Sequence, residues 1–76
     1  MGKCAIRISE DSGFWYLKVL SEDGLQAEFT PFPAQAKVFN YYVDAIDFRR
    51  KHPHIKGRIV NLDKERQRYA QCALIP

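Results

Sequence analysis

The residues with the clearest chemical capacity form a cluster of cations in the second half of the chain. Between Arg49 and Arg58, five of the ten residues are Lys or Arg and two are His. Cations at this density can neutralise phosphates or an acidic protein surface. They also suit the last turn of a helix followed by a solvated loop, because cations complement the helix dipole there. On the functional interpretation, partner or nucleic-acid contacts come from Arg49, Arg50, Lys51, His54, Lys56 and Arg58.

A second candidate surface combines aromatic and basic residues of a predicted strand. Side chains alternate between the two faces of a strand, which groups Phe14, Tyr16 and Lys18 on one face, with Arg7 on a neighbouring strand. Nucleic-acid bases stack on sheet aromatics that have cations nearby. The alternative is that these aromatics pack beneath loops or the C-terminal segment. If the face is open, Tyr16 and Lys18 are binding residues.

Catalytic and metal-binding patterns find little support. His52, His54, Cys4 and Cys72 carry metal-ligand atoms, but their spacing is not the paired spacing typical of zinc sites. The chain has no nucleophile motif, glycine-rich phosphate loop or nucleotide fingerprint. We therefore expect a protein that is not an enzyme and that uses no metal or cofactor.

These candidate residues need elements to position them, and the strongest helix signal begins at Asn40. Asn40 is a good N-cap residue, and Pro53 ends the helix, since the residue before a proline avoids the α region. An alternative start is Pro33, because proline is well tolerated in a first helical turn. The apolar arc of this helix contains Tyr41, Tyr42, Ala45, Ile46 and Phe48.

Alternating side chains and turn residues predict strands around this helix. Three strands are expected before it, at 4–9, 14–20 and 25–30, joined by turns at 10–13 and 21–24. One more is expected at 57–62, and residues 36–39 are either a short strand or part of the helix. Residues 63–73 are either a short helix capped by Asp63 or an added strand.

The predicted fold is a single small α+β domain spanning residues 1–76. It has an antiparallel sheet of three to five strands packed on one central helix, in two layers with a ββ(β)αβ order. We expect the helix-facing side of the sheet to contain Ile6, Ile8, Trp15, Leu17, Val19, Leu25 and Phe29.

Charge and composition narrow the classes of partner. Residues 1–38 carry four Lys and Arg against five Asp and Glu, whereas residues 39–76 carry eight against four, which together give the net charge of +3. A basic half of this kind favours an anionic partner. The sequence contains no apolar run long enough for a membrane and no secretion signal at its start. Two cysteines, most simply reduced thiols, then predict a cytoplasmic protein.

The order of these segments resembles that of small proteins carried by phages and prophages, including anti-CRISPR inhibitors. The resemblance lies in the stretch AKVFNYYVDAIDFRRKHP, which follows a hairpin containing FWYLKV and SEDG. It implies a cytoplasmic protein that acts by binding and not by chemistry, and it assigns no functional residue. We therefore expect a protein partner with an acidic surface. A nucleic-acid-binding domain that uses residues 49–58 is the alternative.

Overall fold

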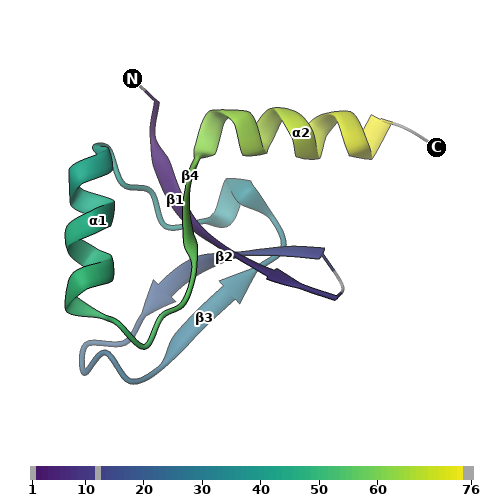
Figure 1. Cartoon of the computed structure of the whole chain (residues 1–76). Helices are drawn as coiled ribbons and strands as arrows, with labels where there is room; N and C mark the ends of the chain where they lie inside the picture. Colours follow the sequence, from purple (N-terminus) through teal and green to yellow (C-terminus); the bar gives the residue numbers. More distant parts are fainter. Residues whose placement is uncertain (1, 12, 75–76) are drawn as a thin grey trace.

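The computed structural model describes residues 2–11 and 13–74, with side chains described as far as residue 71, and shows an α+β fold (Figure 1). Four strands form one antiparallel sheet in the order β3-β2-β1-β4. This confirms the predicted fold class. The elements are β1 (Cys4–Glu10), β2 (Gly13–Leu20), β3 (Ala27–Thr30), the 3-10 turn η1 (Pro33–Gln35), α1 (Tyr42–Lys51), β4 (Arg58–Asn61) and α2 (Leu62–Leu74).

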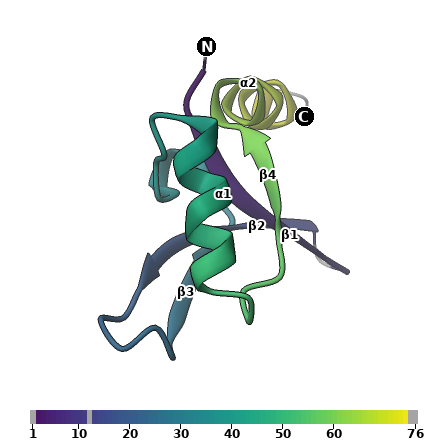
Figure 2. The same ribbon diagram turned by 60° about the vertical axis from the view of Figure 1, so that its left-hand side comes forward.

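The face of the sheet under α1 holds the larger apolar cluster. Ile6 and Leu17 are fully buried there against Ala45 of α1, and Phe29 and Phe48 pack at its margin. Alternation along β1 and β2 turns these side chains toward the helix, as predicted. Figure 2 shows α1 running alongside β4, with α2 at the end where β4 finishes.

Two residues expected on this face lie elsewhere. A β-bulge between Leu17 and Val19 shifts the register of β2 against β3, so the alternation changes phase and Val19 is 48% exposed. Leu25 lies in the turn before β3 and is 78% exposed. A bulge depends on the partner strand, so the pattern of β2 alone does not reveal it.

The helix α1 begins one residue later than the predicted cap at Asn40 implies. The N-cap is Tyr41, in an extended conformation and without a side-chain capping bond, so the prediction of Asn40 as the cap is wrong. The reason is a two-way backbone pairing, in which the amide of each of Cys4 and Phe39 donates to the carbonyl of the other at 2.8 and 2.9 Å. This pairing keeps the chain extended before the helix. The alternative start at Pro33 is also wrong, because only the short turn η1 forms there.

The second helix follows β4 without a connecting loop. The side-chain oxygen Oδ1 of Asn61 accepts from the amide of Lys64 at 3.1 Å, so Asn61, and not Asp63, caps α2. The helical alternative for residues 63–73 is therefore confirmed, and the strand alternative is wrong. Leu62 is fully buried in a second cluster, on the sheet face opposite α1, together with Ala5 and Tyr16.

Candidate functional site

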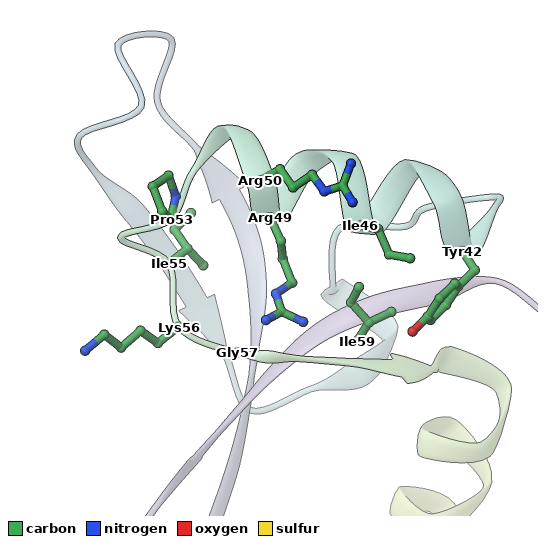
Figure 3. A pocket seen from close by; sticks show the side chains of 9 residues that line it. All are labelled: Tyr42, Ile46, Arg49, Arg50, Pro53, Ile55, Lys56, Gly57 and Ile59. Carbon is green, nitrogen blue, oxygen red and sulfur yellow. The ribbon is translucent and has the colours of Figure 1, made fainter.

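A groove runs between α1 and β4, with a volume of about 650 Å³ (Figure 3). Its sides come from two elements that are separated along the chain but joined by the loop of residues 52–57. The groove combines apolar side chains with cations. The residues that line it are Tyr42, Ile46, Arg49, Arg50, Pro53, Ile55, Lys56, Gly57 and Ile59.

The spacing of the helix brings its lining residues to one side. Tyr42, Ile46 and Arg49 are separated by four and three residues, which places them one above another on the same face of α1. In Figure 3, Tyr42 and Ile46 point toward Ile59 of β4, and Arg49 extends toward Gly57. The groove therefore has an apolar part beside the first turns of α1 and a basic part near its end.

Gly57 lets the chain pass close to β1 at the basic end. A Cβ atom at this position would lie 2.6 Å from Cγ2 of Ile6 and 3.2 Å from the carbonyl oxygen of Arg7. Separations below 3 Å do not occur for real side chains. A residue with a side chain at position 57 would push this segment away from the sheet and change the width of the groove.

The cations of the groove form no ion pair within the described residues. Arg49, Arg50 and Lys56 are exposed, and within residues 2–11 and 13–74 no carboxylate forms an ion pair with any of them. The adjacent Lys51 differs, because its Nζ lies 3.2 Å from Oδ2 of Asp47. The three cations are thus available to an external anion.

A second hollow, of about 560 Å³, continues the groove past the start of α1. It shares Tyr42 and Ile59 with the groove, and Tyr41 and Val43 add further exposed apolar surface. Cys4, a buried free thiol, also lines it. The two hollows together follow β4 from Gly57 to Asn61. This apolar extension is absent from the sequence prediction, which assigns Tyr41 and Tyr42 to the core, whereas they are 61% and 59% exposed.

The remaining cations predicted from residues 49–58 are not gathered at the groove. His54 is exposed and lies beside His52, with 6.0 Å between the ring centres. Arg58 is paired in register with Arg7, so its side chain points to the sheet face opposite the groove. Lys18 is exposed at the bulge of β2, two strands away from β4. The predicted binding stretch is therefore divided between different surfaces.

The predicted aromatic platform is largely covered by α2. Tyr16 is only 4% exposed, and its hydroxyl donates to Oε1 of Glu65 at 2.9 Å. The same oxygen accepts from Nη1 of Arg7 at 2.8 Å. Burial, followed by the Glu65 carboxylate, raises the pKa of Tyr16 to about 12. At Tyr16 the open-face interpretation is therefore wrong, and its alternative, packing beneath the C-terminal segment, is confirmed. Phe14 remains 40% exposed, with the guanidinium of Arg7 4.0 Å from its ring centre.

Two further kinds of site are absent from the described part of the chain. Among its residues, no three His, Cys, Asp or Glu side chains are grouped so that they could hold a metal ion. No described helix is long and apolar enough to cross a membrane. The side chain of Cys72 lies outside the described residues. Comparison with protein-family models, curated proteins and solved structures gives no match.

Proposed function

We propose that this chain is a non-enzymatic binding protein that captures an acidic surface of another protein in the groove between α1 and β4. The observation that carries the proposal is the set of three cations, Arg49, Arg50 and Lys56, that border an apolar groove and have no described acidic partner. Arginines and aromatic side chains around an apolar centre are the residues that dominate protein–protein affinity.

The apolar part of the groove favours a protein over a nucleic acid. Tyr42, Ile46 and Ile59 are exposed or half-buried and offer surface to apolar side chains, and a phosphate backbone would leave that surface unused. Nucleic-acid binding through sheet aromatics also loses support, because Tyr16 is buried beneath α2. A cytoplasmic inhibitor of the phage type would work in this way, by occupying a surface of a host protein complex.

The test is capture of a partner by the tagged full-length protein from a nuclease-treated bacterial lysate. We expect a protein with an acidic surface to remain bound. The amount captured should fall at least about tenfold in the variant Arg49→Glu/Arg50→Glu, because the reversed charges repel the partner. The matched control is Lys64→Glu/Arg66→Glu, which changes the net charge equally at two exposed residues of α2.

Two results would contradict the proposal. One is equal capture of the same protein by both double variants. The other is capture of nucleic acid alone from a parallel lysate without nuclease, released by nuclease or by salt, since phosphate contacts weaken steeply as salt rises. That second result would assign the cations to the nucleic-acid alternative. Circular dichroism of each variant checks that its fold is intact.

A further inference from the structure

The outer edge of β4 carries backbone groups that face away from the sheet. β4 is the last strand in the order β3-β2-β1-β4, so β1 pairs with one side of it only. Leu62, directly after β4, donates its amide to the carbonyl of Lys3 at 2.8 Å. This bond shows which residues of the segment face β1.

In an antiparallel ladder, hydrogen-bonded pairs alternate with pairs that are not hydrogen-bonded. The register Cys4↔Asn61 makes Lys3 and Leu62 the next pair. Since they are bonded, Cys4 and Asn61 are not. The bonds of Cys4 agree, because its amide and carbonyl are both used by Phe39 on the other side of β1.

The alternation therefore turns the amide and carbonyl of Ile59 outward. Asn61 and Gly57 are each two residues from Ile59, so the amide of Asn61 and the backbone of Gly57 also face the outer side. All three residues line the two hollows, and Val60 adds to the lining of the second one. The outer edge of β4 therefore has both outward-facing backbone groups and hollows that can accept side chains.

We infer that this edge binds an extended acidic segment of the partner as a fifth, antiparallel strand beside β4. Addition of a strand to a sheet edge is a general mode of peptide recognition, in which backbone bonds give affinity and pockets for alternate side chains give specificity. The antiparallel direction continues a sheet in which every described pair is antiparallel. The inference rests on the proposed function and specifies that the bound partner segment is an extended strand.

The geometry also sets the order of side chains in that strand. A residue opposite Ile59 would direct its side chain toward Tyr42 and Ile46. The residue two positions earlier, opposite Asn61, would face the hollow of Tyr41 and Val43. Two positions later, opposite Gly57, a carboxylate would meet Arg49. The segment therefore reads apolar, any residue, apolar, any residue, acidic, from its N- to its C-terminal end.

A short peptide tests this order directly. The probe is an acetylated and amidated heptapeptide with the sequence threonine, valine, threonine, valine, threonine, aspartate, threonine, titrated into the ¹⁵N-labelled full-length protein. We expect amide shifts at Gly57, Ile59 and Asn61. We also expect slower hydrogen exchange at Ile59, which should exchange faster than Val60 in the free protein because only Val60 is bonded to β1.

Three matched peptides separate strand pairing from simple charge attraction. The reversed sequence has the same composition but carries its aspartate at the wrong end. N-methylation of the second valine removes a donor that faces β4, whereas N-methylation of the threonine after it alters an amide that faces solvent. We expect the first two changes to weaken binding at least about tenfold, the worth of roughly one hydrogen bond, and the third to have little effect.

The protein variants complete the experiment. Arg49→Glu should weaken the original peptide at least about tenfold, and a lysine in place of the aspartate should restore its binding. Lys64→Glu should leave affinity unchanged. Equal affinity for the forward and reversed peptides, equal effects of the two N-methyl groups, or no binding of the heptapeptide would each overturn the inference. Capture of the partner through Arg49 and Arg50 would still stand in those cases, so the two proposals fail separately.

Discussion

The carboxylate of a single residue, Glu65, joins α2 to the middle of the sheet. It is 3% exposed, and one of its oxygens accepts from both Arg7 and Tyr16. Nε of Arg7 is also buried, and the structure describes no hydrogen-bond partner for it. The Glu65 carboxylate therefore offsets most of the cost of removing the Arg7 guanidinium from water. The Arg7–Glu65 ion pair therefore helps to hold α2 on this face of the sheet.

Glu65→Gln should lower the free energy of unfolding by about 3 kcal/mol, because it keeps the volume but leaves Arg7 as an uncompensated buried charge. The measurement is urea denaturation at neutral pH. The control is Arg68→Gln, which removes the outer partner of Glu65. Its side chain is 54% exposed and its Nη2 lies 3.5 Å from Oε2, so a loss below about 1 kcal/mol is expected. Similar losses for both variants would contradict the role of the buried pair.

Tyr16 should make stability depend on pH in the alkaline range. Its pKa is raised from 10.0 to about 12 in the folded protein, so the fold favours the neutral phenol. This contribution is fully present below pH 10 and is lost as pH rises from 10 to 12, because the unfolded chain ionises first. The measurement is the urea midpoint from pH 9 to 12 for the wild type and Tyr16→Phe. The wild type should lose more stability across this window, and parallel curves would contradict the assignment.

At the scale of elements, the loop between α1 and β4 sets the width of the groove. Gly57→Ala places a methyl group against Cγ2 of Ile6, a contact of 2.6 Å before any movement. We expect a loss of about 1–3 kcal/mol, typical of overpacking, together with changed amide shifts along β4. Urea denaturation and NMR measure both effects.

A double-mutant cycle provides the control for Gly57→Ala. In an Ile6→Ala background the clashing atom is gone, so the added methyl group should cost less. An identical cost in both backgrounds would show that contact with Ile6 does not explain the requirement for glycine. The carbonyl of Arg7, at 3.2 Å, would then be the remaining constraint.

The elements could be predicted from the sequence where their causes are local. Alternation in 4–9 and 14–20, turn residues between them and Pro53 after the helix all act over a few residues, and the structure confirms these elements. The errors have distant causes. Phe39 pairs with Cys4 and so removes Asn40 from the cap. Similarly, Tyr16 is covered by a helix that begins 46 residues later, at Leu62.

In the candidate site, too, only the features with local causes could be predicted from the sequence. The high density of cations in residues 49–58 is visible in the sequence. Which of them share a groove depends on strand register, and this separates Arg58 from Arg49. The apolar extension beside Tyr41 and Val43 could not be foreseen, because the helical arc assigned Tyr41 to the core. Tyr41 is instead the N-cap of α1 and is exposed.

At the scale of the whole molecule, the chain forms a thin body of 41 × 29 × 17 Å. The two helices lie on opposite faces of the sheet and both contact β1 and β4. A body this thin offers surface grooves and little depth, which suits recognition along an edge. The basic second half of the sequence supplies the three cations beside that edge, Arg49, Arg50 and Lys56.

The four-residue length of β4 has a consequence for the protein at high concentration. An open strand edge is a template for aggregation, and natural sheets limit it with short edge strands and flanking charges. β4 combines both devices, because Arg49, Arg50 and Lys56 stand beside a short edge. Like charges on two copies repel, so we expect these cations to oppose the pairing of two β4 edges. Substitutions that neutralise them would therefore reduce the yield of soluble protein even where the fold is unchanged.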